Sequence, residues 1–317
     1  MKGFAFCLAL LFGVPVLAQP YPSKPIRVIV PFPVGGIADI YSRLIGNRWS
    51  ELWGQPVLVE NRAGAGGNIA ADLVAKAAPD GYTLVMGSIG THAVNVSLFS
   101  KLPYDPVRDF APIALAVDAD GLLAVHPSVP AQNVAELIAL ARSRPGGLTY
   151  ASAGAGTASH LAGELFKAMA KVDMVHIPYK GNVPAITDLL AGQTSLIFAT
   201  MPTVLPHTRA GKLRALATTG DARAAASPEL PTVAETLPGF VVNNWVGLFA
   251  PAGTPADIVS RLNAETAKFM QSKEIAARLA AEGARFVPMT PDQFGSFVKA
   301  EIAKWAPVVK ASGAKAD

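Results

Sequence analysis

The chain has 317 residues, a net charge of +4 at pH 7 and a single cysteine, and 16% of its residues are charged. This length is sufficient for two domains and a large buried core. The basic residues are scattered and not interleaved with aromatic residues, which argues against nucleic-acid binding, and one cysteine excludes a disulfide framework within the chain.

The first residues have the pattern of an export signal. Lys2 precedes an apolar run from Gly3 to Val16, and small residues occupy positions −3 and −1 before a cleavage point after Ala18. The run is too short to span a bilayer comfortably, and a core helix is the alternative. We predict that residues 1–18 are a signal peptide and that the mature protein is periplasmic. Cys7 lies inside this segment, so the mature chain has no cysteine. No later segment resembles a membrane span.

A strand, a loop of small residues and a helix begin the mature chain. The mostly β-branched run Ile26–Val30 predicts a buried parallel strand. Gly35-Gly36 then permit a turn, and apolar residues from Ile40 to Trp53 recur at helical spacing, with Asp39 as the expected N-cap. Because the start of a helix leaves backbone N–H groups free, the loop Val34–Asp39 is predicted to bind a carboxylate.

The same pattern recurs along the chain. Further strands are predicted at residues 57–60, 82–86, 113–117, 122–125, 148–151, 172–177, 195–198, 213–218 and 244–249. Further helices are predicted around residues 69–74, 134–144, 161–169, 186–190, 258–269, 275–282 and 292–309.

Two positions break the alternation of strands and helices. The strands at 113–117 and 122–125 have no helix between them, so we predict that the chain crosses there into a second lobe and returns along 244–249. The last three helices have no new strands to cover and are expected to pack on the first lobe. The prediction is an α/β protein with lobe 1 over residues 19–118 and 249–317, and lobe 2 over residues 119–248.

Enzyme and cofactor motifs are absent from the sequence. Gly87-Ser88-Ile89-Gly90 does not have the spacing of a nucleophile elbow, and Gly64–Gly67 lacks the third glycine of a dinucleotide fingerprint. The five histidines show no close metal-ligand spacing. His92 and His160 follow hydroxyl residues in loops and are interpreted as loop-packing or ligand-edge residues rather than catalytic bases. We therefore predict no catalytic residue, metal or organic cofactor.

Loops of Gly, Ala, Ser and Thr follow several predicted strands. In parallel sheets such loops gather at the carboxyl ends of the strands, where ligands bind. Small side chains let backbone N–H groups approach an anion, and hydroxyl donors are supplied by Ser88, Thr91, Ser152, Thr157 and Thr200. For a single loop, tight turning alone is a sufficient explanation. For all of these loops taken together, we predict a polar cleft between the lobes that accepts an anion.

Motifs in seven segments resemble those of the Bug-type solute receptors, which are the extracytoplasmic binding proteins of tripartite tricarboxylate transporters. The segments are residues 31–39, 59–68, 79–84, 176–181, 211–217, 231–235 and 247–255. The resemblance implies a periplasmic-binding-protein-like (type II) fold, in which two α/β lobes with central sheets are joined by two crossover strands and close on a small carboxylate. It also implies a receptor rather than an enzyme, with permease subunits of the inner membrane as partners.

The resemblance and the loops together give the candidate ligand-binding residues. They are Phe32, Gly35, Gly36, Ala38, Asp39, Ala65, Gly66, Asn68, Ser88, Thr91, His92, Ser152, Gly154, Thr157, His160, Tyr179, Lys180, Ala199 and Thr200. Two positions depart from the family pattern. Relatives often have a hydroxyl or amide residue where this chain has Ala38, and an aspartate where it has Ala199. The second departure disfavours an amino-acid ligand. Arg62 and Lys180 are possible counter-charges, with surface or hinge ion pairing as the alternative.

Two other functions remain open at this point. An exported α/β hydrolase or lyase that acts on a carboxylated substrate would use the same cleft. A receptor that presents its loaded lobes to a membrane sensor kinase would also share the site.

Overall fold

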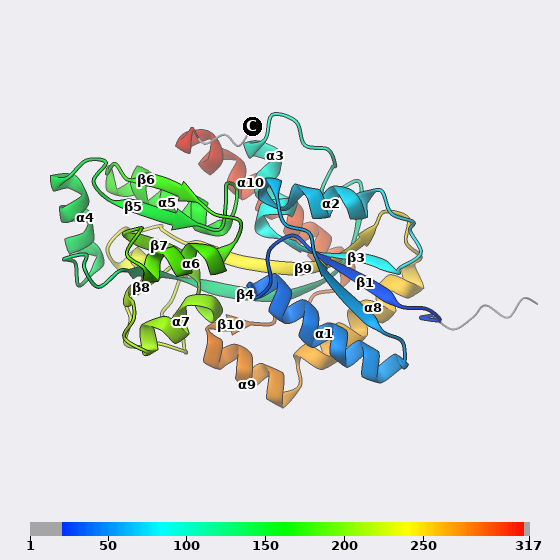
Figure 1. Cartoon of the computed structure of the whole chain (residues 1–317). Coiled ribbons are helices and arrows are strands. Elements are labelled where there is room, and N and C mark those ends of the chain that lie inside the picture. The colour runs from blue at the N-terminus through cyan, green and yellow to red at the C-terminus, as the bar shows by residue number, and fades with distance from the viewer. Residues whose placement is uncertain (1–20, 314–317) are drawn as a thin grey trace, which may run out of the picture.

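The computed structural model describes residues 21–313, so the predicted signal peptide lies outside the described residues. One mixed sheet runs through the molecule with the strand order β2-β1-β3-β9-β4-β7-β5-β6, and helices cover both of its faces (Figure 1). The predicted α/β architecture is confirmed.

The first lobe is built around strand β1 (Ile26–Val30), which pairs in parallel with β2 (Val57–Asn61) and β3 (Thr83–Ser88). Helix α1 (Ile37–Trp53) packs on one face of these strands through Tyr41, Ile45 and Trp49, each at most 1% exposed. Their spacing of four residues places them on one side of the helix. Helix α2 (Asn68–Ala75) packs on the opposite face, with a short 3-10 turn η1 (Ala65–Gly67) before it.

A π-helical turn η2 (Gly90–Val94) and helix α3 (Asn95–Leu98) follow β3. The sequence predicted neither of them, because segments this short carry no helical repeat.

The second lobe repeats the arrangement. Its parallel strands are β5 (Thr149–Ser152), β6 (Val175–Pro178) and β7 (Leu196–Thr200). Its helices are α4 (Val134–Ser143), α5 (Ala158–Ala170), α6 (Asn182–Leu190) and α7 (Met201–Arg209). Strand β8 (Arg214–Thr218) and the 3-10 turn η3 (Val233–Glu235) complete it. The strand predicted at 195–198 extends to Thr200, and α7, which the sequence did not predict, begins directly after it at Met201, with Pro202 tolerated in its first turn.

Two antiparallel strands join the lobes. Strand β4 (Phe110–Val125) is one continuous strand of 16 residues, not the two short strands that were predicted. It pairs with β9 (Asn243–Pro251) as far as Asp120, and with β7 from Gly121 onward. Both strands cross the middle of the molecule in Figure 1. The predicted crossover is therefore present, while the residue limits of the lobes stay a prediction.

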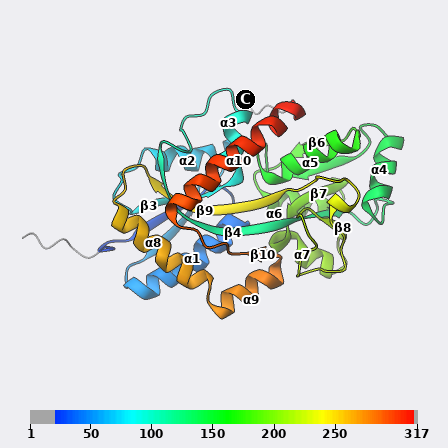
Figure 2. The ribbon, with the colours of Figure 1, turned by 180° about the vertical axis from the view of Figure 1, so that it is seen from behind.

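The C-terminal helices are α8 (Ala256–Met270), α9 (Lys273–Glu282) and α10 (Pro291–Ser312). Helix α8 packs on β4 and α1, as expected for lobe 1. Between α9 and α10, the two-residue strand β10 (Ala284–Arg285) pairs with β4. Helix α10 contacts β4, η2 and α3 but also α5 of the second lobe, and Figure 2 shows it running diagonally across the back. The last helix therefore touches both lobes.

Candidate ligand-binding site

A pocket lies between the two lobes and is crossed by both connecting strands. It encloses about 50 Å³, which is room for a few water molecules. Its lining residues are Phe32, Gly36, Ile37, Ala38, Ser88, Ile89, Gly90, Gly121, Thr157, Ala158, Ser159, Ala162, Asn182, Phe198, Ala199, Thr200, Thr219, Val242, Asn244 and Val246. Within the described part of the chain, this lining contains no charged side chain.

Three helix N-termini of the second lobe meet at this pocket. Helices α5, α6 and α7 each follow one of the strands β5, β6 and β7, so they begin at the same edge of the sheet. Their N-cap residues are Thr157, Gly181 and Thr200, none of which caps its helix through a side chain within the described structure. No acidic residue lies in their first turns. Each N-terminus thus presents free N–H groups and roughly +0.5 of an elementary charge.

Asp39 places a negative charge at the N-terminus of α1, a helix of the first lobe. The N-cap of this helix is Gly36, so the prediction that Asp39 is the N-cap was wrong. The Asp39 carboxylate accepts hydrogen bonds from Gly35 N–H at 2.9 Å, from Asn61 Nδ2 at 3.0 Å and from Arg43 Nε at 3.0 Å. Burial opposes its ionisation, but these hydrogen bonds outweigh burial and lower the pKa of Asp39. The N–H of Gly35 is therefore already used by the protein.

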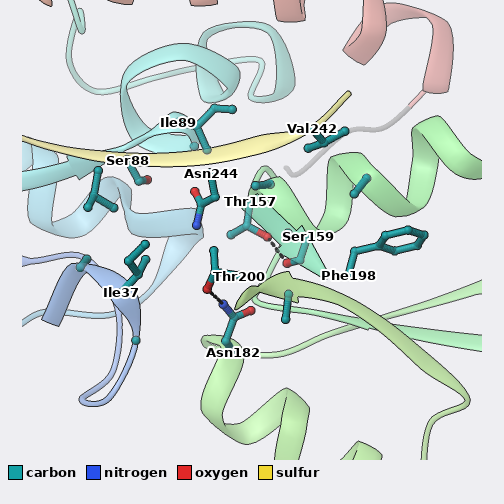
Figure 3. Close-up of a pocket in the computed structure, with 18 of the residues that line it drawn as sticks. Ile37, Ser88, Ile89, Thr157, Ser159, Asn182, Phe198, Thr200, Val242 and Asn244 are labelled. Carbon is teal, nitrogen blue, oxygen red and sulfur yellow. Dashed lines mark hydrogen bonds between the residues drawn. The ribbon is translucent and has the colours of Figure 1, made fainter. Parts of the chain in front are cut away.

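Hydrogen bonds around Thr200 orient the side-chain amide of Asn182. The Thr203 hydroxyl donates to the Thr200 carbonyl oxygen over 2.8 Å, so it accepts from the Thr200 hydroxyl 3.1 Å away. The Thr200 hydroxyl oxygen can then only accept from Asn182 Nδ2, at 3.4 Å. This leaves Asn182 Oδ1 buried with no partner among residues 21–313. Figure 3 shows the amide nitrogen of Asn182 directed at Thr200.

Seven of the candidate residues line this pocket: Phe32, Gly36, Ala38, Ser88, Thr157, Ala199 and Thr200. A second, more open cavity of about 250 Å³ also lies between the lobes, and it shares Phe32 with the pocket. Five candidates line only that cavity: Ala65, Gly66, Gly154, Tyr179 and Lys180.

The other seven candidates line neither space: Gly35, Asp39, Asn68, Thr91, His92, Ser152 and His160. Most of their polar atoms are engaged inside the protein. Asn68 Oδ1 accepts from Asn95 and from Tyr104, and Thr91 Oγ1 accepts from the backbone N–H of Ser88. These side chains support the loops around the pocket, and a role in binding stays a prediction for them.

The two counter-charges proposed from the sequence lie outside the pocket. Arg62 forms an ion pair with Glu60 at 3.2 Å, which agrees with the alternative interpretation of surface pairing. Lys180 is exposed and lines only the second cavity. The polar side chains that line the pocket in the described structure are therefore uncharged.

Three histidines have lowered pKa values, because burial disfavours the charged form of the ring. Burial lowers the pKa of His92 to about 3, and its ring stacks on Phe249 with a centroid distance of 3.8 Å. Burial, together with the neighbouring His160, lowers the pKa of His176 to about 4. His176 Nε2 lies 2.6 Å from Ser152 Oγ, and its ring stacks on that of His160. These contacts are those of packed loop residues.

Sequence reasoning missed several pocket residues, among them Asn182 at the start of α6 and Asn244 on β9. The site was predicted on loops that follow strands, and not on the strands that cross between the lobes. A polar Asn243-Asn244 pair in an otherwise apolar strand was the available signal for the second residue. The Asn244 side chain has no hydrogen-bond partner within residues 21–313 and projects into the pocket, as Figure 3 shows.

Two further findings concern the described residues as a whole. Among residues 21–313, His, Cys, Asp and Glu side chains form no group of three or more that could hold a metal ion. No helix in this part of the chain combines the length and the apolar character required to cross a membrane.

Comparisons with known proteins agree in pointing to one family. A family model described as the tripartite tricarboxylate transporter family receptor matches residues 41–314. The chain is 41% identical over 303 residues to protein BugT of Bordetella pertussis, which covers 95% of this chain and 93% of that protein.

Solved structures are similar over nearly the whole chain. The structure of R. palustris Rpa4515 with adipate has a TM-score of 0.90 and 39% identity, and covers 92% of this chain and 98% of that one. MatC from Rhodopseudomonas palustris with bound malate has a TM-score of 0.87 and 37% identity, and covers 91% of this chain and 100% of that one.

Proposed function

The chain belongs to the tripartite tricarboxylate transporter receptor family, and we propose that it captures a small organic carboxylate between its lobes and delivers it to the permease subunits of such a transporter. The family resemblance and the periplasmic-binding-protein-like fold predicted from the sequence are both confirmed. Proteins of this family are periplasmic solute-binding receptors.

The observation that carries the proposal is the convergence of three free helix N-termini on an uncharged pocket between the lobes. Thr157, Asn182 and Thr200 place the starts of α5, α6 and α7 at its wall. Backbone N–H groups and helix dipoles favour an anion without a counter-charged side chain. Within the described residues, the lining offers no carboxylate that could hold an ammonium group, and Ala199 lies at the position where the family resemblance implies an aspartate. The bound adipate and malate of two relatives support a carboxylate ligand.

The decisive experiment is the identification of the bound compound. Protein purified from the periplasm would be denatured and the released compound identified by mass spectrometry, followed by calorimetric titration of the same compound. We expect a small carboxylate that is released unchanged and rebinds to the emptied protein. A released compound without a carboxyl group would contradict the proposal.

We propose that the chain has no catalytic activity. The hydrolase or lyase alternative requires a general base near the ligand, and no histidine lines the pocket in the described structure. Incubation of the identified compound with a large amount of protein distinguishes the two functions. A receptor leaves the compound intact, whereas turnover would establish an enzyme.

Delivery to a permease is tested by the partner that the loaded receptor binds. Cross-linking in cells should capture permease subunits of the inner membrane. Capture of a sensor kinase instead would favour the ligand-presenting alternative.

Export is part of the same proposal. N-terminal sequencing of the periplasmic protein should begin at Gln19, directly after Ala18. Recovery of a chain that retains Met1 from the cytosol would contradict it.

A further inference from the structure

The loop of residues 153–157, named here the contact loop, brings backbone of the second lobe against the first lobe. It follows β5 and ends at the N-cap of α5, on the wall of the pocket (Figure 3). A Cβ added to Gly66 would lie 3.0 Å from the carbonyl oxygen of Ala155. A Cβ added to Gly90 would lie 3.0 Å from the carbonyl oxygen of Gly156. The contact loop is therefore part of the surface on which the two lobes meet.

Three backbone N–H groups of the contact loop are held by side chains of the second lobe. Those of Ala153 and Gly154 donate to serine hydroxyl oxygens, at 2.8 and 3.1 Å. The third, that of Gly156, donates to Nδ1 of His160 at 3.2 Å. A serine hydroxyl oxygen accepts a hydrogen bond at any pH, whereas an imidazole nitrogen does so only while it is unprotonated. The bond between Gly156 and His160 is therefore the one of these three that a proton can break.

This hydrogen bond requires the neutral ring of His160. Because Nδ1 faces the Gly156 N–H, the proton of the neutral ring is on Nε2. The side chain is 5% exposed, and burial lowers the pKa of His160 despite the nearby Glu164. The bond is therefore intact at neutral pH. A proton added to Nδ1 would turn the acceptor into a second donor that faces the Gly156 N–H.

The groups packed around the ring make His160 the first of two stacked histidines to take a proton. Glu164 and Lys167, one and two turns further along α5, act on its pKa in opposite directions. His176 of β6 stacks on it with a centroid distance of 4.4 Å, and Tyr150 of β5 donates to Glu164. Burial and the charge of a protonated His160 lower the pKa of His176 to about 4. Helix α10 also packs on α5, and within residues 21–313 none of its charged groups acts on the pKa of His160.

We propose that His160 is the positioning residue of the contact loop, and that solute binding requires its neutral ring, so that mild acid weakens binding by releasing the loop from the first lobe. This inference rests on the proposed function, since it describes the regulation of the same binding site.

Two substitutions separate the hydrogen bond of His160 from its charge. His160→Asn keeps an acceptor near the position of Nδ1 and cannot take a proton, whereas His160→Leu has no acceptor. The probe for calorimetry is the carboxylate recovered from the denatured wild-type protein. At pH 7.5, His160→Leu should weaken binding by about fivefold or more, and His160→Asn should recover most of this loss.

The pH dependence is the readout that a merely structural role would not change. In the wild-type protein, the dissociation constant should rise by up to about tenfold for each pH unit below the pKa of His160. Measurements between pH 7.5 and pH 5.5 keep a simple carboxylate ionised. The affinity of His160→Asn should stay constant over this range. A wild-type slope in His160→Asn, or wild-type affinity in a folded His160→Leu protein, would overturn the inference.

His126→Asn is the matched control. Nδ1 of His126 also accepts from a backbone N–H, that of Ser128 at 3.3 Å, in a partly exposed turn that lines neither space between the lobes. This variant should keep the affinity and the pH dependence of the wild-type protein. A loss of pH dependence in His126→Asn equal to that in His160→Asn would count against a specific role of His160.

Nuclear magnetic resonance of the ligand-free protein tests the loop without a solute. The amide resonance of Gly156 should shift with pH at the same midpoint as the His160 ring, and it should not titrate in His160→Asn. A Gly156 amide that does not follow the ring would overturn the inference and leave the proposed function in place. If no carboxylate binds to the wild-type protein, the proposed function fails, and the amide titration still decides whether His160 positions the loop. The wild-type titration does not depend on the folding of any variant.

Discussion

Arg285 binds Asp118 and Asp120 at the point where β4 passes from one lobe to the other. Its Nη1 donates to Asp120 Oδ1 at 3.1 Å, and its Nη2 donates to Asp118 Oδ2. Both aspartates are largely buried, and burial raises their pKa despite the nearby guanidinium. One residue further along β4, Gly121 pairs with the second lobe. Arg285 therefore pairs with both carboxylates where β4 passes between the lobes.

Loss of this cation should destabilise the protein. Arg285→Met leaves Asp118 and Asp120 without their charge partner, and we expect the free energy of unfolding to fall by about 1–3 kcal/mol, since Arg285 is partly exposed. The deficit should shrink at low pH, where the aspartates are protonated. Urea unfolding at pH 7 and pH 4 measures both effects.

The matched control for this prediction is Arg278→Met, which removes an exposed pair with Glu282 on α9. Its cost should stay below about 0.5 kcal/mol. Equal losses in the free energy of unfolding for the two variants would show that the pairing of Arg285 with two buried aspartates stabilises the protein no more than an exposed pair does.

A carboxylate placed inside the pocket should repel the ligand. Ala199 is 2% exposed and lines the pocket at the end of β7. Ala199→Asp should weaken binding of the identified carboxylate at least tenfold, or about 1.4 kcal/mol, because like charges are then buried together. Ala199→Asn has nearly the same shape without the charge and should lose much less. Calorimetry on both variants separates the effect of the added charge from that of the added side-chain volume. Equal losses of affinity would attribute the weaker binding to volume.

A methyl group at Gly90 should hinder closure of the lobes. A Cβ added there would lie 3.0 Å from the carbonyl oxygen of Gly156, which belongs to the other lobe. We expect Gly90→Ala to weaken binding several-fold and to reduce the compaction on ligand binding seen by small-angle scattering.

Gly36→Ala is the control for steric hindrance, since its nearest contact would be the Pro33 carbonyl oxygen at 3.8 Å. Because Gly36 lines the same pocket, the control is read from closure, which should match that of the wild-type protein. A radius of gyration that ligand leaves unchanged in the wild-type protein would contradict closure itself.

Stability should fall in acid because of buried neutral histidines. The pKa of His92 is lowered from 6.5 to about 3, so below pH 6.5 the unfolded chain binds a proton that the folded protein does not. The free energy of unfolding should therefore decrease as pH falls from 6.5 toward 3, by up to roughly 1.4 kcal/mol for each pH unit.

Urea midpoints measured between pH 7 and pH 4 check this prediction. His92→Gln should make the decrease shallower, with His176 and His160 still contributing to it. A variant with the wild-type slope would show that His92 does not titrate in this way.

Much of the architecture follows from the sequence because it depends on local patterns. The run Ile26–Val30 was predicted as a strand with the limits that the structure has, since four of its five residues are apolar and buried. The long helices at 134–144 and 275–282 were placed within one or two residues, because their apolar residues recur at helical spacing. The family motifs also extend over nearly the whole mature chain, which is why the family could be predicted.

The tertiary structure decided which donors remain free for a ligand. Asp39 was expected to cap its own helix, but its carboxylate accepts from Gly35 in the preceding loop, from Arg43 one turn along α1 and, across the fold, from Asn61 at the end of β2. In the same way, Asn182 and Asn244 are 62 positions apart in the sequence and line one pocket because the fold brings β9 and the start of α6 to its wall. The spacing of apolar residues indicates which side of a helix or strand is buried. Hydrogen-bond partners and pocket walls depend on contacts between distant elements, so only the folded structure could identify them.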